Sequence, residues 1–353
     1  MSGIFYARVP GFYAEVERSR EPALRCRPVL VGGDPRKRGR VQAATPEAVR
    51  AGVRPGMPML EALALCPGAA IRRTDLRAYR EVARRLRVRL AEEMGRVEPE
   101  GLDAAFLDRP RVPGSSEEVA RRLQDAVRDE LGLPLAVGVA AVRFVARLAC
   151  EEAGWEGALR VPAGRERAFL APLPVHRLPG VGPQTAERLA VLGARTLGQL
   201  ATLDPGPLQE LLGNHGLSLW RMARGEGDGR VRDAFRPRSL SQETTLAEPT
   251  IDLTALESAL SQLTVGLEER LRLQGHAARR VTLKVRYADA GTATRTVTRD
   301  RPVAAAPELQ QVARTLLART QAGVRPVRLV GLSLSHLVPR EPSEERQLEL
   351  FSP

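Results

Sequence analysis

The chain is organised around residues 98–108, which read Glu98-Pro99-Glu100-Gly101-Leu102-Asp103-Ala104-Ala105-Phe106-Leu107-Asp108. We interpret this stretch as a central strand, on which side chains alternate between the two faces. Glu100 and Asp108 stand three and five residues from Asp103, and both spacings are odd. A regular strand therefore turns both carboxylates away from Asp103, and only a bulge could re-aim one of them. Asp103 is expected to be alone on its face, where an ordinary paired Asp is the plainer interpretation.

A second stretch reads Arg8-Val9-Pro10-Gly11-Phe12-Tyr13-Ala14-Glu15-Val16-Glu17. It closes a strand predicted over residues 4–9, which ends at Pro10-Gly11, and it opens a helix at Phe12. Both stretches resemble motifs of Y-family translesion DNA polymerases, usually V-E-P-x-S-x-D-E-A-Y/F-L-D and D-x-D-x-F-F/Y-A-x-V-E. The resemblance implies a palm domain in which acidic residues hold two Mg²⁺ ions for nucleotidyl transfer.

Two of those acidic positions are replaced in this chain. Arg8 stands where the first-strand motif has its metal-binding Asp, and Ala104 stands where the central motif has Glu, so that Asp103 alone is kept. Two divalent ions need several oxygen ligands, and a guanidinium cannot lose its proton to become one. We expect no catalytic residue, no metal and no other cofactor, with Arg8 pairing with Asp103 in place of a cation.

Residues 41–59 resemble the fingers motif V-x-x-A-S/N-Y-E-A-R-x-x-G-V-x-x-G-M-P. The family's triphosphate-gripping Tyr and Arg are Pro46 and Val49 here, so these nucleotide contacts are expected to be lost. Arg143 keeps a positive charge where the family places a Lys near the nucleotide phosphates. Tyr13 stands at the position that the family uses to exclude ribonucleotides, although it could simply be packed.

The segment Leu178-Pro179-Gly180-Val181-Gly182 before a helix predicts a helix-hairpin-helix element. Glycines let the backbone approach a partner closely, and N–H groups at a helix start can bind a phosphate. An ordinary tight connection between helices is the alternative. Agreement with the thumb of the family favours DNA contact at Gly180, Val181, Gly182 and Arg188.

After residue 238 the pattern predicts strand, helix, strand, strand, helix and strand, which matches the little-finger domain of the same family. In the second strand apolar residues alternate with polar ones, so one face can pack on helices while the other meets phosphates. A merely solvated face is the alternative. The expected DNA contacts in and before this domain are Arg238, Ser239, Arg280, Lys284, Arg286 and Arg295.

The net charge of +12 and the pI near 10.8 favour a polyanionic partner, although arginine richness can also follow genome composition. The three cysteines are widely spaced and give neither a disulfide framework nor zinc spacing. No secretory signal and no membrane segment is expected, so a cytoplasmic protein without membrane contact is predicted.

Residues 339–353 are predicted to form a flexible tail. Within it, Gln347, Leu348, Leu350 and Phe351 resemble the Q-L-x-L-F peptide by which bacterial polymerases bind the β sliding clamp. Two large apolar residues in a charged tail favour a partner that buries them.

The fold class that follows is α+β, with the right-hand architecture of the Y family and a C-terminal tail. The expected domains are a palm (residues 1–10 and 74–168), fingers (11–73), a thumb (169–229), a linker (230–238), a little finger (239–338) and the tail.

Loss of the acidic ligands together with a kept clamp peptide resembles the ImuB branch, whose members are inactive polymerase relatives. The predicted function is therefore a non-catalytic scaffold that binds primer–template or damaged DNA and the clamp and supports translesion synthesis by another polymerase. The branch implies an ImuA/RecA-like protein and an error-prone C-family polymerase as further partners. Its members usually carry a segment after the clamp peptide that this sequence lacks, which leaves those two partners open. The alternative is an active translesion polymerase with a rearranged metal site.

Overall fold

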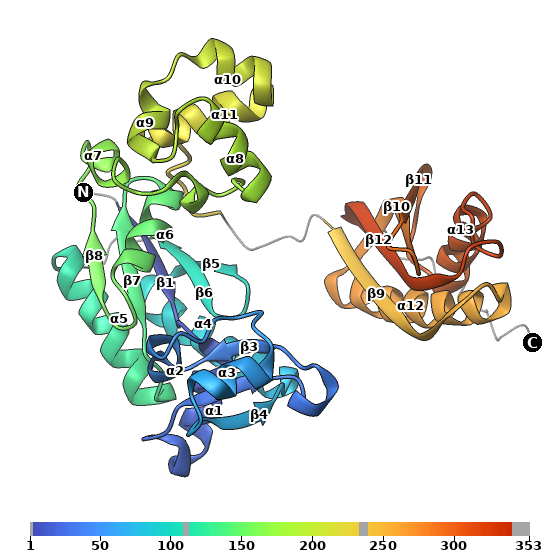
Figure 1. The fold of residues 1–353 in the computed structure, drawn as a ribbon, viewed down its shortest axis with the longest axis horizontal. Coiled ribbons are helices and arrows are strands. Elements are labelled where there is room, and N and C mark those ends of the chain that lie inside the picture. Colours follow the sequence, from blue (N-terminus) through green and yellow to red (C-terminus); the bar gives the residue numbers. More distant parts are fainter. Residues whose placement is uncertain (1–2, 109–112, 233–238, 341–353) are drawn as a thin grey trace, which may run out of the picture. The chain divides into compact units, whose positions relative to one another are not determined.

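The computed structural model describes residues 3–108, 113–232 and 239–340. The chain forms two compact units on either side of residues 233–238, and each is described by itself (Figure 1). The first unit contains two sheets and a group of short helices, and the second contains one sheet with two helices.

The main sheet of the first unit is five-stranded, in the order β5-β6-β1-β7-β8. Its strands are β1 (Ile4–Arg8), β5 (Arg96–Glu100), β6 (Ala104–Asp108), β7 (Ala136–Ala140) and β8 (Ala158–Arg160). The middle strand β1 runs antiparallel to both neighbours, with Arg8 opposite Ala104 of β6 and Ala136 of β7. The stretch 98–108, predicted to be one central strand, is instead a hairpin: residues 98–100 belong to β5, residues 101–103 form a turn, and residues 104–108 are β6, next to the middle strand.

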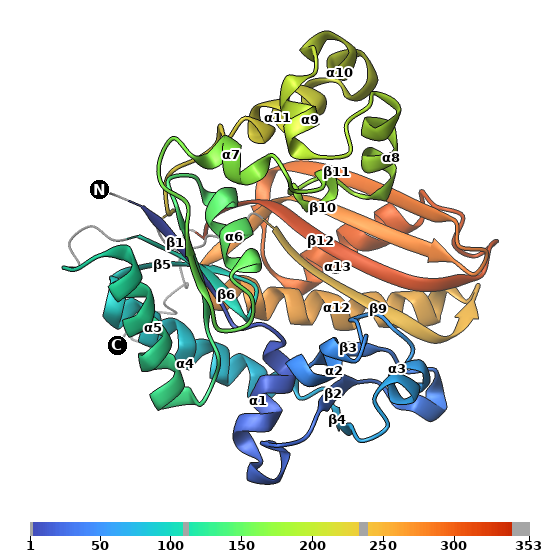
Figure 2. The same ribbon diagram turned by 60° about the vertical axis from the view of Figure 1, so that its left-hand side comes forward.

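Alternation along these strands separates two hydrophobic cores. Phe5, Ala105 and Leu107 face α4 (Leu76–Met94) and α5 (Ser116–Leu131), which lie side by side (Figure 2). Tyr6 and Phe106 point the other way, where α6 (Arg143–Glu152) covers the sheet. The close fit of α6 depends on Gly138, since a Cβ there would lie 1.9 Å from the carbonyl oxygen of Ala146.

The chain leaves β1 through Pro10 and Gly11 and enters a smaller three-stranded sheet, in the order β3-β2-β4. Gly11 adopts a left-handed conformation with φ 63°, which turns the chain directly into α1. The elements of this part are α1 (Phe12–Arg20), η1 (Pro22–Leu24), β2 (Val29–Gly32), η2 (Pro35–Lys37), β3 (Val41–Ala44), α2 (Pro46–Arg50), α3 (Met59–Leu65) and β4 (Ala70–Arg73).

Short helices complete the first unit. They are α7 (Glu166–Leu170), η3 (Val175–Arg177), α8 (Pro183–Val191), α9 (Leu197–Thr202), α10 (Pro205–Leu212) and α11 (Asn214–Ala223). Their apolar side chains, including Leu189, Leu200 and Leu219, join the core on the α6 side of the main sheet. The helix predicted after Gly182 is therefore α8.

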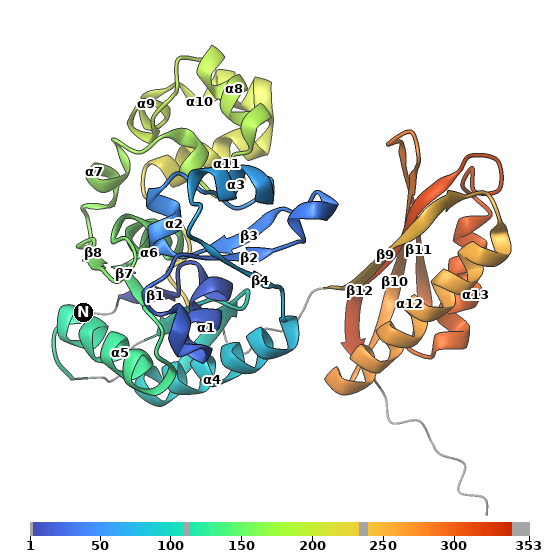
Figure 3. The same cartoon turned by 60° about the horizontal axis from the view of Figure 1, so that its bottom comes forward.

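The second unit has the predicted strand and helix order. A four-stranded antiparallel sheet, ordered β11-β10-β12-β9, carries α12 and α13 on one face (Figure 3). The elements are β9 (Ser239–Thr250), α12 (Leu253–Gln274), β10 (His276–Tyr287), β11 (Thr292–Val303), α13 (Ala306–Leu317) and β12 (Val327–Pro339).

Within the described residues, every helix is too short or too polar to cross a membrane.

A buried ion pair joins the start of α6 to β5. Arg143 donates through both terminal nitrogens to Glu98, with one distance of 2.9 Å, and its guanidinium lies 3.9 Å from the ring centroid of Phe106. Glu98 also accepts from the backbone N–H of Arg232 at 2.7 Å. Although partial burial opposes it, the hydrogen bond from Arg143 holds the pKa of Glu98 below its ordinary value.

We expect Arg143→Ala to lower the free energy of unfolding of the first unit by about 3 kcal/mol, because it leaves a buried carboxylate without its cation. Arg147→Ala is the matched control on the same helix. Its partner Glu100 and Arg147 itself are 41% and 39% exposed, so about 1 kcal/mol or less is expected. Urea unfolding followed by tryptophan fluorescence measures this unit alone, since both tryptophans belong to it. Equal losses in the two variants would contradict the assignment.

Candidate functional site

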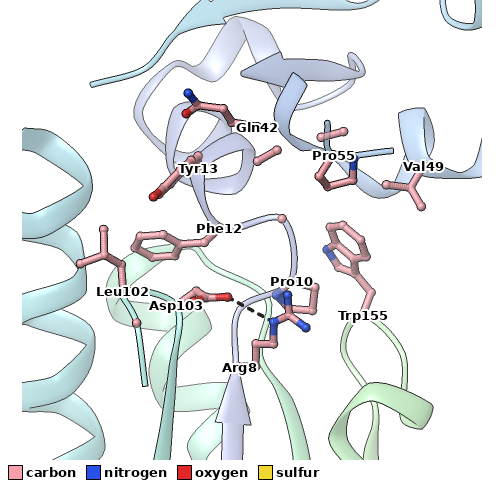
Figure 4. A pocket seen from close by; sticks show the side chains of 14 residues that line it. Arg8, Pro10, Phe12, Tyr13, Gln42, Val49, Pro55, Leu102, Asp103 and Trp155 are labelled. Atoms are coloured by element: carbon pink, nitrogen blue, oxygen red, sulfur yellow. Dashed lines mark hydrogen bonds and ion pairs between the residues drawn. The ribbon is translucent and has the colours of Figure 1, made fainter. Parts of the chain in front are cut away.

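A cavity of about 580 Å³ opens at the end of β1 (Figure 4). Its walls come from the end of β1, the start of α1, β3, α2, the turn between β5 and β6, and the loop before β8. Apolar and aromatic groups dominate them, with Phe12, Tyr13 and Trp155 as the large rings. Arg8 and Asp103 are the charged side chains among the described residues that line it.

Arg8 and Asp103 form the expected ion pair in this cavity. The Nε of Arg8 donates to Oδ2 of Asp103 at 3.2 Å, and the backbone N–H of Val9 donates to the carbonyl of Asp103 at 2.8 Å. The two side chains are 39% and 33% exposed. A pair this exposed contributes about 1 kcal/mol or less, so a stronger anion can compete for Arg8.

The prediction that Glu100 faces away from the site was wrong. Asp103 lies in the turn before β6 rather than on the strand, so counting residues from it does not assign a face. Glu100 lies opposite Ala104, which in turn lies opposite Arg8, and residues paired in this way share a face of the sheet.

Glu100 is already occupied by two donors. It accepts from the hydroxyl of Tyr6 at 2.5 Å and from Arg147 at 3.2 Å. Burial, and then the hydrogen bond to Glu100, raise the pKa of Tyr6. Glu100 is therefore a second carboxylate on the site's side of the sheet, held by a tyrosine and an arginine.

These residues, in the pairing observed, do not fit two divalent ions. Mg²⁺ demands near-octahedral oxygen ligation, whereas Ala104 offers no ligand and Asp103 is engaged by a guanidinium. Across residues 3–108, 113–232 and 239–340, no group of three or more His, Cys, Asp or Glu side chains could hold a metal.

The other positions expected near the nucleotide divide into two groups. Val49 and Tyr13 line the cavity, and the ring of Tyr13 stacks on Tyr79 with centroids 4.5 Å apart. Pro46 begins α2 and Arg143 is taken up by Glu98, so neither lines the cavity.

Trp155 and the buried Glu15 behind it were not predicted as site residues from the sequence. Trp155 lines the cavity from a loop whose glycines, Gly154 and Gly157, stand on either side of Trp155-Glu156. A large aromatic residue between glycines was the available signal.

The hairpin before α8 presents its backbone outward at Gly182. A Cβ at Gly182 would meet nothing within 4 Å, so packing does not require a glycine there. Arg188 on α8 is exposed. Val181 differs from the other predicted contacts, because its side chain is buried and its N–H donates to Leu178. Its side chain and its N–H therefore hold the hairpin together and are not free to contact a ligand.

In the second unit, Arg280, Lys284 and Arg286 share the face of the sheet that the helices leave open. Lys284 is paired with Glu243 at 2.9 Å. The rows across this face are rich in hydroxyl groups, which come from Ser239, Ser241, Thr282, Thr294, Thr296, Thr298, Ser333 and Ser335.

The prediction that Arg295 belongs to this face was wrong. Arg295 lies opposite Leu283, a buried residue of the helix-covered face, and therefore points to that side. Its Nε donates to the carbonyl of Arg319 at 2.8 Å. Arg238 and the peptide residues Gln347, Leu348, Leu350 and Phe351 lie outside the described residues.

Three protein-family profiles match this chain, and together they cover most of it. The profile described as "impB/mucB/samB family" matches residues 8–151, that of its C-terminal domain matches residues 237–350, and that of "DNA polymerase-iota, thumb domain" matches residues 176–227.

Curated relatives match over the full length. A protein of Halorhodospira halophila named "DNA polymerase IV" is 38% identical over 352 residues, covering 99% of this chain and 98% of its own. A protein of Listeria monocytogenes with the same name is 34% identical and is covered to 95%, as is this chain.

Solved structures agree on the fold. "Y-family DNA polymerase chimera Dbh-Dpo4(243-245)-Dbh" matches with a TM-score of 0.82 at 22% identity, covering 96% of this chain and 100% of that one. "Insertion ternary complex of Dbh DNA polymerase" matches with a TM-score of 0.73, with the same coverage.

The expectation of a non-catalytic, ImuB-like scaffold is contradicted by these relatives, because they are named as polymerases. The expectation that the chain is not an enzyme is contradicted with it. So is the expectation of no cofactor, since phosphoryl transfer by polymerases uses divalent ions. The error lay in equating two substituted positions with loss of function, although the side chains of the Arg8–Asp103 pair are 39% and 33% exposed, and such a pair can exchange partners at small cost. The ImuA/RecA-like protein and the error-prone C-family polymerase were expected only from the ImuB branch, so they are no longer expected as partners.

The fold, the family profiles and relatives of the same length agree with one another. The chain belongs to the impB/mucB/samB family, within the Y-family DNA polymerases.

Proposed function

We propose that the chain is a translesion DNA polymerase of the DNA polymerase IV type, which extends a primer along template DNA with nucleoside triphosphates. The observation that carries the proposal is the cavity at the end of β1, in a chain that matches relatives of this name from end to end. The domain boundaries given above for palm, fingers, thumb and little finger are part of this proposal.

The cavity offers two features that suit a triphosphate. The N–H groups of Phe12 and Tyr13 stand at the start of α1, where no earlier turn supplies acceptors, and no side chain caps this helix. A helix start of this kind attracts anions. Arg8 adds a full positive charge to the lining of the same cavity. A triphosphate bound here satisfies the free donors of the helix and pairs with Arg8.

The Arg8–Asp103 pair opens when a triphosphate binds. Charge-assisted hydrogen bonds to phosphate exceed the contribution of a half-exposed ion pair. Competition for Arg8 then frees the carboxylate of Asp103, and Glu100 lies on the same face of the sheet as Arg8. The opening of the Arg8–Asp103 pair is necessary for polymerase activity, since the closed pair does not accommodate metal ions.

Contacts to DNA come from backbone and hydroxyl donors more than from lysines. The open sheet face of the second unit combines rows of Ser and Thr with Arg280 and Arg286, and hydroxyl groups hydrogen-bond phosphate oxygens without reading sequence. Gly182 and Arg188 present a second phosphate contact in the first unit.

Primer extension tests the activity. With a primer–template, the four deoxynucleoside triphosphates and Mg²⁺ or Mn²⁺, we expect incorporation directed by the template base. We expect Asp103→Ala to slow it at least about a hundredfold, because Asp103 is the acidic residue kept from the family's metal-binding motif, and in-line phosphoryl transfer depends on such carboxylates. Asp108→Ala is the control, since this carboxylate pairs with Arg96 at the far end of β6. Absence of templated incorporation with either metal would reject the proposal.

We propose further that Gln347, Leu348, Leu350 and Phe351 bind the bacterial β sliding clamp, on the strength of the sequence motif. Tethering to a clamp raises the effective concentration of the polymerase on DNA without a new DNA contact.

We expect the double substitution Leu350→Ala and Phe351→Ala to abolish capture of the chain on immobilised clamp, because the two apolar anchors are lost. Glu349→Ala serves as the control and is expected to bind like the parent. Undiminished capture of the double variant would show that the peptide has another role.

A further inference from the structure

Trp155 lines one side of the cavity, and it belongs to none of the family motifs described above. It enters from the loop between α6 and β8 and packs against the backbone of Gly11 at the start of α1. A Cβ placed on Gly11 would lie 2.8 Å from Cζ2 of the indole and 2.6 Å from the carbonyl oxygen of Ala44. The ring therefore borders the N–H groups of α1 that are proposed to receive the triphosphate.

Glu15 lies on the first turn of α1 and is only 2% exposed. Its Oε2 accepts from Nε and a terminal nitrogen of Arg18 at 3.0 and 2.6 Å. Within the described residues, its other oxygen, Oε1, has no hydrogen-bond partner, and neither has the buried Nε1 of Trp155.

The two unpartnered groups are close enough to interact. The indole N–H of Trp155 lowers the pKa of Glu15, so it points toward this carboxylate, although the pair does not meet hydrogen-bond geometry in the structure. An unsatisfied buried donor and acceptor gain free energy by forming a hydrogen bond.

The neighbours of Glu15 have opposing effects on its pKa. Burial raises its pKa to about 7, the guanidinium of Arg18 opposes this rise, and the neighbouring carboxylate of Glu47 adds to it. Arg18 is shared, since it also donates to Glu47 at 3.1 Å. Arg18, Glu47 and Trp155 are the groups that face Glu15 from α1, α2 and the loop. The carboxyl is protonated below neutral pH and ionised above it.

We propose that Glu15 is a positioning residue that acts through Trp155: its ionised carboxylate accepts the indole N–H and fixes the ring in the cavity wall, where the ring orders the ligand site. The identity of the ligand as a nucleoside triphosphate rests on the proposed function, whereas the contact between Glu15 and Trp155 does not. An ionised carboxylate is a stronger acceptor than the neutral acid. The ring is therefore fixed above about pH 7 and released below it.

The contact is tested first without nucleotide or DNA. In a Trp220→Phe background, Trp155 is the single tryptophan of the chain. We expect its fluorescence emission to change with pH, with a midpoint near 7. Glu15→Gln should remove this transition. Glu17→Gln is the matched control on the same helix, because Glu17 is also buried but accepts from Tyr79, and it should leave the transition intact.

Emission that does not change with pH, or a transition that persists in Glu15→Gln, would overturn the proposal. The Trp220→Phe protein keeps Glu15, so its pH titration tests the proposal even if Glu15→Gln fails to fold. Failure of primer extension alongside an intact transition would reject the proposed function and leave the contact standing.

The consequence for the cavity is tested with a fluorescent deoxynucleoside triphosphate as the probe. If only the ionised form orders the site, the competent fraction rises from about a tenth at about pH 6 to about nine tenths at about pH 8, and affinity rises about ninefold. The phosphate of the probe titrates as well, so the expected result is the difference between parent and Glu15→Gln. Trp155→Phe, which keeps a ring without the N–H, should behave like Glu15→Gln. Parallel pH profiles for all three proteins would contradict the proposal.

Discussion

The register of β1 between β6 and β7 is the constraint on which the candidate site depends. It places Arg8 opposite Ala104 and Ala136 at the end of the sheet, immediately before the chain turns at Gly11 into α1. A slip by one residue would exchange the two faces of the strand. Phe5 would then leave the core under α4 and α5, and Arg8 would leave the cavity. Burial of β1 on both sides thus fixes a charged residue at one defined position.

The chemistry at that position follows from how weakly Arg8 is held. Its ion pair with Asp103 is half-exposed, in contrast to the pair of Arg143 with Glu98, whose side chains are 16% and 10% exposed. The buried pair is expensive to break and anchors α6, whereas the exposed one can exchange partners at small cost. Because the Arg8–Asp103 pair can open at small cost, a site that contains a guanidinium beside an acid is compatible with relatives that are named as polymerases. The same cavity, with Trp155 as a wall set by a buried carboxylate, then has two adjustable parts, which are the Arg8–Asp103 pair and the ring of Trp155.

Much of the architecture could be predicted from the sequence, because period-two and helical patterns report burial directly. The strand before Pro10 and the strand and helix order after residue 238 are of this kind. The face of Glu100 was missed because Asp103 belongs to a turn, where alternation does not hold. The side of Arg295 depends on its pairing with Leu283 across two strands, which composition does not give. Glu15 and Trp155 lie 140 residues apart in the numbering, and only the packing of the loop on α1 brings them together. The function was misjudged because two substitutions were weighed without knowing how firmly the remaining groups are paired.

The most direct test of the account is a crystal structure of the chain with primer–template DNA, a non-hydrolysable deoxynucleoside triphosphate and Mn²⁺. The triphosphate is expected in the cavity at the end of β1, against the first N–H groups of α1, with Arg8 on phosphate and its bond to Asp103 broken. An Arg8–Asp103 pair that stays closed, with the nucleotide bound elsewhere or absent while DNA is bound, would contradict this expectation.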